Sequence, residues 1–137
     1  MKVIGLNGRE YKIKLVDKKR KDCSALHKKA RHLIKEVFPF EVFYEELTLH
    51  GSRTNNNRVL FADFLSPRLR LIVEVHGKQH YEYSAHHHGN QAGFAKHKRR
   101  DSVKKEWAEL NSFTLVELPY NESEDEWRTR IRNWNNT

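Results

Sequence analysis

The first clear pattern of apolar positions predicts an amphipathic helix between Ser24 and Pro39. Ser24 is a favourable N-cap, and the helix should stop before Pro39 because proline cannot continue it. The apolar stripe at helical spacing consists of Leu26, Ala30, Leu33, Ile34 and Val37. His27 and Glu36 lie on opposite flanks of this stripe, so either side chain could reach a cleft at the edge of the helix.

Stretches rich in apolar residues then predict a series of strands. The expected strands cover residues 40–44 with 47–49, then 60–64 and 71–75, and a polar loop is expected over 51–58. Pro67 favours a turn between the last two strands, which should therefore form an antiparallel hairpin. Asp63 and Glu74 then belong to adjacent strands. Side chains alternate along a strand, so His76 should point to the same face as Glu74.

Both ends of the chain add further elements. Asn7-Gly8 between two short apolar runs predicts an N-terminal β-hairpin, either a plain edge structure or a DNA-contacting appendage. Near the other end, a helix is expected over 103–110, a strand over 113–118 and a helix over 124–134. Asp101 would suit the N-cap of the first of these helices. The order predicts an α/β (α+β) fold, a mixed central sheet flanked by helices, with the hairpin and a basic linker in residues 1–22 and one core domain in 23–137.

The net charge of the chain indicates which kind of partner to expect. The 137 residues contain 26 Lys and Arg against 18 Asp and Glu, a formal net charge of +8, which suits a polyanion such as double-stranded DNA. No apolar run is long enough to span a membrane, and no signal-type segment is recognisable, so we expect an intracellular protein that is neither secreted nor membrane-bound. With Cys23 as the single cysteine, disulfides within the chain are excluded.

The positive charge is concentrated in candidate phosphate contacts. The run of charged residues at 17–22 is either a solvated linker or a segment that contacts the DNA backbone. The expected DNA-binding residues are Lys18, Lys19, Arg20, Lys21, Lys78, Lys96, Lys98, Arg99 and Arg100. Lys78 and Arg100 could also offset negative charge in a transition state.

Asp63 and Glu74 are the candidate metal ligands. A carboxylate inside a mostly buried strand is costly unless a cation or hydrogen bonds compensate it. Two of them on neighbouring strands suit a shared Mg²⁺, with Mn²⁺ as an expected substitute. A solvent-exposed strand face carrying an acid and a histidine is the plainer alternative. After Gly77 the backbone can turn sharply, which would let His80 fold back toward the acids.

Asp63-Phe64 followed by Ile72-Val73-Glu74-Val75-His76-Gly77-Lys78-Gln79-His80 resembles the PD-(D/E)XK nuclease superfamily. More narrowly, it is similar to the very-short-patch-repair endonuclease-like branch and its DUF559 relatives. Within that branch the small free-standing homing endonucleases of bacteriophages are most similar. The resemblance runs from about Ser24 to Leu118 and implies a restriction-endonuclease-like core.

The resemblance implies roles for particular residues. Asp63, Glu74 and the backbone carbonyl of Val75 would bind Mg²⁺, and His80 would position or deprotonate the attacking water. His76 and Asp101 also match catalytic positions, although the spacing after Asp101 differs by about one residue. The branch usually carries a glutamate on the first helix; His27 stands there instead, and Glu36 is out of register. The zinc of the repair endonuclease should be absent because its cysteines are missing, and His86-His87-His88 cannot all converge on one tetrahedral ion.

The expected function is therefore metal-dependent hydrolysis of DNA phosphodiester bonds, with no small-molecule substrate, by a monomer or homodimer. A homing endonuclease that nicks or cleaves a specific site is the first hypothesis. A repair or resolving endonuclease of the same fold is an alternative, as are a DNA-binding module without catalysis and an interaction protein whose charge serves solubility. The sequence does not define the target site or the role of residues 86–88.

Overall fold

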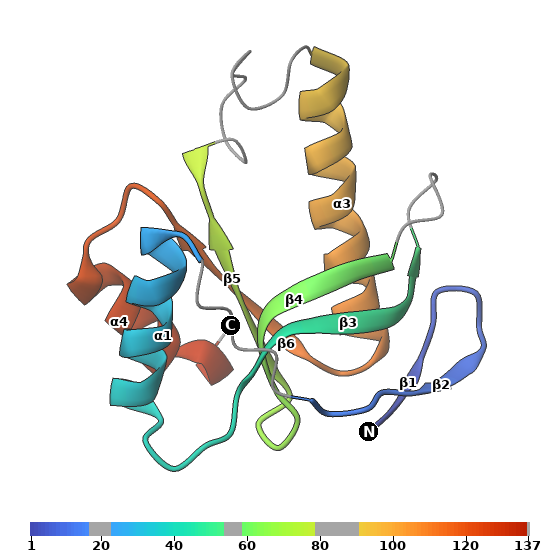
Figure 1. The fold of residues 1–137 in the computed structure, drawn as a ribbon, viewed down its shortest axis with the longest axis horizontal. Helices are drawn as coiled ribbons and strands as arrows, with labels where there is room; N and C mark the ends of the chain where they lie inside the picture. Colours follow the sequence, from blue (N-terminus) through green and yellow to red (C-terminus); the bar gives the residue numbers. More distant parts are fainter. Residues whose placement is uncertain (17–22, 54–58, 79–90, 137) are drawn as a thin grey trace.

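The computed structural model describes residues 1–16, 23–53, 59–78 and 91–136, with the backbone alone for most of 91–97 (Figure 1). The elements are β1 Lys2–Ile4, β2 Glu10–Lys12, α1 Ala25–Val37, β3 Tyr44–Arg53, β4 Val59–Ser66, β5 Leu71–His76, α3 Gln91–Leu110, β6 Thr114–Pro119, α4 Glu124–Arg132 and a 3₁₀ turn Trp134–Asn136.

The central sheet has the strand order β3-β4-β5-β6. The pairs β3–β4 and β4–β5 are antiparallel, whereas β5 and β6 run parallel and are connected through α3. Parallel neighbours require such a crossover, which explains why a helix separates these two strands. The predicted mixed sheet, flanking helices and N-terminal hairpin are all confirmed.

Helices cover both faces of the sheet. Figure 1 shows α1 and α4 on one side and α3 on the other. Ala30 and Leu33 of α1 pack with Trp127 of α4 against Leu71 and Val73 of β5. The core on the α3 side contains a second set of buried residues, among them Leu47, Leu49, Leu65, Ile72 and Trp107. Alternation along β5 therefore divides the two cores, as the pleat requires.

The predicted helix starts have explicit caps. Ser24 Oγ accepts a hydrogen bond of 3.1 Å from the backbone N–H of His27 at the start of α1. Ser123 and Glu126 form a reciprocal capping box at the start of α4. The first cap matters for the site, because it fixes the turn of α1 that carries His27.

The N-terminal hairpin packs into the α3-side core. Val3 and Ile13 are buried there, and the amide side chain of Asn111 bonds both backbone groups of Ile4 at 2.7 and 2.9 Å. The backbone N–H of Leu6 donates to the carbonyl of Gly51 at 3.0 Å, where β3 begins to bend toward β4. The hairpin is thus attached to the end of α3 and to β3.

Two predicted boundaries are wrong. β3 begins at Tyr44 and continues to Arg53, so residues 40–43 lie outside it and 51–53 are strand and not loop. Pairing of Arg53 with Val59, beyond an irregularity after Leu49, extends the strand through polar residues. Tertiary pairing overrides local composition here.

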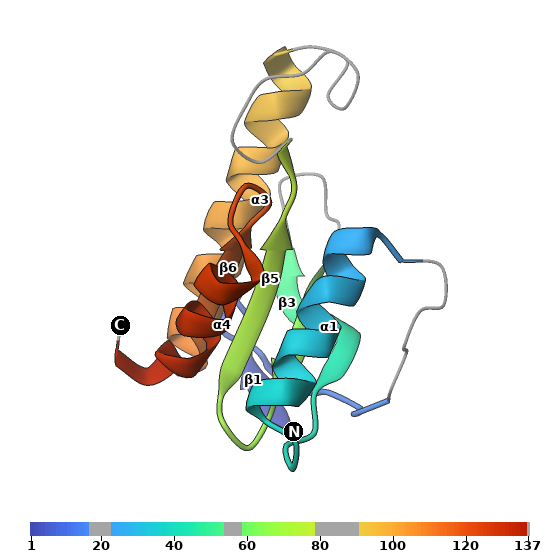
Figure 2. The ribbon, with the colours of Figure 1, turned by 90° about the vertical axis from the view of Figure 1, so that its left-hand side faces the viewer.

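The second error concerns α3, which begins at Gln91 and not after Asp101. Asp101 therefore lies inside the helix, and its predicted N-cap role is wrong. The missed turns contain many Lys and Arg, which favour helix, but they show no apolar periodicity. Figures 1 and 2 show why: these turns project beyond the sheet, so no face of them is covered by it.

Gly51→Ala should destabilise the protein far more than Gly8→Ala. Both glycines have φ +82°, which disfavours a Cβ by roughly 1 kcal/mol or somewhat more. At Gly51 a Cβ would also lie 2.3 Å from the Cα of Gly5, whereas nothing lies within 4 Å of one at Gly8. Urea denaturation should therefore give a lower free energy of unfolding for Gly51→Ala than for Gly8→Ala. Equal losses would contradict the close packing of hairpin and sheet.

Candidate functional site

Asp63 and Glu74 lie where β4 and β5 separate. The paired register runs through Phe64 and Val73, and the two acids come next on their strands. The backbone N–H of Asp63 donates to Glu74 Oε2 at 3.0 Å. The backbone N–H of Val75 donates to Asp63 Oδ2 at 2.9 Å. Each carboxylate thus bonds the opposite strand and is held by it.

The strand register extends these two acids into a row. Glu74 pairs with Glu117 on β6. On the other side, the pairs Glu45 with Phe64 and Leu47 with Ala62 place Glu46 opposite Asp63. Glu46, Asp63, Glu74 and Glu117 therefore cross all four strands at one level. Neighbouring like charges in a sheet are unfavourable, so this level of the sheet needs cations.

Glu74 is the most constrained acid of the row. Its side chain is 2% exposed, and burial together with the neighbouring charge of Asp63 raises its pKa to about 8. Lys104 opposes this rise, with Nζ 2.5 Å from Glu74 Oε1. Within the part of the chain that the structure describes, Oε1 accepts no hydrogen bond of normal geometry. A buried carboxyl in this setting favours a proton or a cation beside it.

Lys104 is a site residue that the sequence did not reveal. Burial lowers its pKa, but the charges of Glu74 and Asp63 outweigh burial, and the net shift is upward. Asp101, one turn earlier in α3, adds to this effect. The misplaced helix start concealed the relation, because only a helix through both residues puts Asp101 and Lys104 on one flank.

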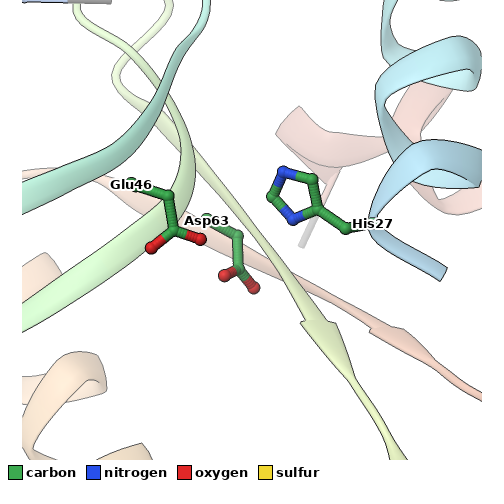
Figure 3. Close-up of side chains that lie close together, drawn as sticks. All are labelled: His27, Glu46 and Asp63. Atoms are coloured by element: carbon green, nitrogen blue, oxygen red, sulfur yellow. The ribbon is translucent and has the colours of Figure 1, made fainter. Parts of the chain in front are cut away.

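A second cluster lies on the α1 side of Asp63. Ligand-type atoms of His27, Glu46 and Asp63 all lie within 4.8 Å of one another. Figure 3 shows the carboxylates of Glu46 and Asp63 facing the imidazole ring of His27. The ring stacks on Phe64 with centroids 4.4 Å apart. Of the two candidates on the first helix, the structure therefore brings His27 to the acids, whereas Glu36 pairs with Arg128 of α4.

Glu46 was also missed, and its backbone explains why. Its φ is +53°, a left-handed conformation that is unfavourable for a residue other than glycine. Simple alternation along β3 does not predict the direction of a side chain at such an irregularity. Antiparallel register was the available signal, since it places Glu46 opposite Asp63. Strained residues of this kind often occur at functional sites.

Glu45 and Arg31 hold His27 in place. His27 Nε2 lies 2.8 Å from Glu45 Oε1, and Arg31 donates to both oxygens of Glu45, at 2.8 and 2.7 Å. Burial raises the pKa of Glu45, but Arg31 and His27 outweigh it, and the net shift is downward. Glu45 is therefore an ionised acceptor, so the hydrogen of the His27 contact belongs to Nε2.

His76 faces the same side of the sheet as Glu74, as alternation predicts. It is buried, and its Nδ1 lies 3.6 Å from Glu117 Oε2. Glu117 also pairs with Lys105 of α3 at 3.2 Å. On the α3 side, Lys104 thus pairs with Glu74 and Lys105 pairs with Glu117. His76 lies in the same charged layer.

The predicted DNA contacts are only partly described. Lys98 and Arg99 are exposed and Arg100 is half-buried on the projecting part of α3, and Lys78 is exposed just after β5. Figures 1 and 2 show the projecting part of α3 near the end of β5, which is the end that carries His76. His80, Lys18, Lys19, Arg20, Lys21, the side chain of Lys96 and residues 86–88 lie outside the described residues.

The donor set fits a divalent cation. Glu46 and Asp63 offer oxygens, and His27 offers a nitrogen. Carboxylate oxygens bind Mg²⁺ and Mn²⁺, and a histidine nitrogen adds affinity for transition metals. The predicted ligand set of Asp63, Glu74 and the Val75 carbonyl remains a prediction.

Comparisons with known proteins give relatives but no family. Uncharacterized protein 307L of Invertebrate iridescent virus 6 is 41% identical over 69 residues, which cover 50% of this chain and 35% of that protein. Uncharacterized protein 094L of Frog virus 3 is 34% identical over 67 residues, which cover 48% of this chain and 43% of that protein. The chain thus spans well under half the length of these relatives. No family model and no solved structure matches it.

In the described part of the chain, none of the helices has the length and apolar character needed to cross a membrane.

Metal-free protein should lose stability as pH rises from about 4.5 to about 8. The pKa of Glu74 is about 8 in the folded state and about 4.5 in the unfolded chain, so across this window the folded state keeps a proton that the unfolded state has released. The free energy of unfolding then falls by up to about 1.4 kcal/mol per pH unit. Urea denaturation in EDTA at several pH values measures the slope.

Glu74→Gln should flatten this dependence, because the amide does not titrate. The exposed Glu10→Gln serves as the matched control and should retain the wild-type slope. An unchanged slope in Glu74→Gln would show that another group causes the dependence.

Proposed function

We propose that the chain is a divalent-metal-dependent DNA endonuclease. The observation that carries the proposal is the row of carboxylates at the separation of β4 and β5, in which Glu74 is buried and Asp63 and Glu74 are fixed by each other's strands. A buried acid beside other acids lowers stability unless a cation compensates it, and such unfavourable clusters are common at functional sites. The net charge of +8 adds a reason to expect nucleic acid as the partner.

The element order supports the same proposal. From α1 to β6 the chain runs helix, three antiparallel strands, helix and a strand parallel to the third. This order, with Asp63 on the second strand and Glu74 on the third, is similar to the core of the PD-(D/E)XK nucleases. Membership of the very-short-patch-repair endonuclease-like branch is part of the proposal, since it rests on that resemblance alone.

In the proposed hydrolysis, each of these residues would have its own role. A divalent cation bound by the acids supplies Lewis-acid polarisation of the scissile phosphate. Lys104 holds Glu74 in place and contributes positive charge beside the reacting phosphate. Lys98, Arg99 and Arg100 contact the DNA backbone along α3. His80 keeps the role that the resemblance implies, which is to position the attacking water. Asp101 supports the site through its charge beside Lys104.

The biological role is proposed at a coarser level. Relatives from Invertebrate iridescent virus 6 and Frog virus 3 support a role inside an infected cell, and action on DNA there is part of the proposal. A homing endonuclease with its own target site remains the first hypothesis, and a repair or resolving enzyme the second. The same core serves all three, because the DNA-contacting additions decide specificity.

Asp63→Asn should abolish cleavage, and Asp125→Asn should not. Supercoiled plasmid and linear duplex DNA are incubated with Mg²⁺ or Mn²⁺, and each strand is mapped for breaks. Loss of a metal-binding carboxylate removes several kcal/mol of transition-state stabilisation, on the order of 100-fold or more in rate. Asp125 makes the matched control because it is a 92% exposed aspartate on α4, paired with Arg128.

Cleavage by Asp63→Asn at the wild-type rate, or in EDTA, would contradict the proposal. Tight duplex binding without cleavage under any metal condition would instead favour a DNA-binding module. Neither binding nor cleavage would favour an interaction protein.

Arg99→Gln should weaken duplex binding for all sequences alike. Each phosphate contact releases about one counterion, so the slope of log affinity against log salt concentration should become less steep by about 1. Arg132→Gln is the matched control, because Arg132 is an exposed residue of α4, which lies on the other side of the sheet from α3 (Figure 1). Equal effects of the two substitutions would exclude α3 as the DNA-binding element.

A further inference from the structure

His27 has a nitrogen that the described residues leave without a partner. Its side chain is 7% exposed, and its only side-chain hydrogen bond among the described residues joins Nε2 to Glu45. Nδ1 therefore remains available within a ring that faces Glu46 and Asp63 (Figure 3). An imidazole nitrogen that faces two carboxylates favours a cation or a proton between them.

The surroundings of His27 fix which nitrogen is free. Arg31 holds both oxygens of Glu45, and Glu45 in turn accepts the hydrogen of His27 Nε2. A neutral imidazole with its hydrogen on Nε2 has a lone pair on Nδ1. Phe64 packs on the ring and prevents it from rotating. A carboxylate that accepts from the far nitrogen of a metal-binding histidine is a common device for orienting that ligand.

We infer that His27, Glu46 and Asp63 form a site selective for a borderline transition-metal dication such as Mn²⁺ over Mg²⁺, with Glu45 and Arg31 as positioning residues. Mg²⁺ prefers oxygen ligands and keeps most of its water, whereas an imidazole nitrogen increases affinity for later divalent metals. The metal's catalytic role rests on the proposed function, but its binding does not.

The site differs from a pair of strand carboxylates alone. Glu74, the other strand acid, is already in close contact with Lys104 at 2.5 Å, on the α3 side. His27 and Glu46 approach Asp63 from α1 and β3. Asp63 is thus the residue shared by two groups, one with a lysine and one with a histidine. The histidine group supplies the nitrogen that discriminates between metals.

Mn²⁺ binding to the full chain without DNA tests the inference. The electron paramagnetic resonance signal of free Mn²⁺ gives its affinity, and competition with Mg²⁺ gives the selectivity. Pulsed measurement on protein labelled with ¹⁵N-histidine reports whether an imidazole nitrogen binds the metal. We expect nitrogen coupling in the wild type and at least roughly tenfold tighter binding of Mn²⁺ than of Mg²⁺.

Three variants separate the roles. His27→Gln should lose the nitrogen coupling and most of the preference for Mn²⁺. Glu45→Gln should keep the coupling but bind Mn²⁺ about 10-fold to 100-fold more weakly, as is typical when an orienting partner is lost. His32→Gln, an exposed histidine on the same helix, should bind like the wild type.

Absence of nitrogen coupling in the wild type would overturn the inference, even if the variants do not fold. So would Mn²⁺ affinity unchanged in His27→Gln, or no Mn²⁺ binding up to millimolar concentration. Nitrogen coupling without DNA cleavage would overturn the proposed nuclease and leave this site. DNA cleavage without nitrogen coupling would overturn the histidine metal site and leave the proposed nuclease.

Discussion

Repulsion between the buried Glu74 and its neighbouring carboxylates is the constraint on which the arrangement of this protein depends. Strand register places Glu46, Asp63, Glu74 and Glu117 at one level of the sheet. The fold compensates them from both sides: Lys104 and Lys105 approach from α3, and His27 approaches from α1. The two helices therefore do more than cover apolar strands. They carry the groups that make a charged level inside a small core tolerable.

Much of this could be predicted from the sequence, where the signals are local. Alternation and the Pro67 turn gave the β4–β5 hairpin and placed Asp63 beside Glu74, and Ser24 gave the start of α1. The site residues that could not be predicted from the sequence depend on long-range structure. Glu46 stands at a left-handed residue that alternation does not describe. Lys104 was missed because residues 91–100 show no apolar periodicity to mark the beginning of α3.

The ion pair between Arg31 and Glu45 is another feature that could not be predicted from the sequence. Each of these residues alone is an ordinary charged position, one on a helix and one on a strand. Their pairing depends on how α1 lies across β3, which no spacing in the sequence encodes. Geometry at the site is consequently a product of the core: Ala30, Leu33 and Phe64 set the position of α1, and so the position of His27.

The parallel pairing of β5 with β6 has an evolutionary consequence. Its register, from Leu71 with Thr114 to His76 with Pro119, fixes both ends of the crossover that contains α3. Within α3, the buried anchor is at Trp107 and Ala108, near the end of the helix. Insertions or deletions in α3 before Asp101 would change how far the helix extends beyond the sheet while leaving Lys104 beside Glu74. Descendants of such a chain could diversify in what they recognise while inheriting an unaltered centre.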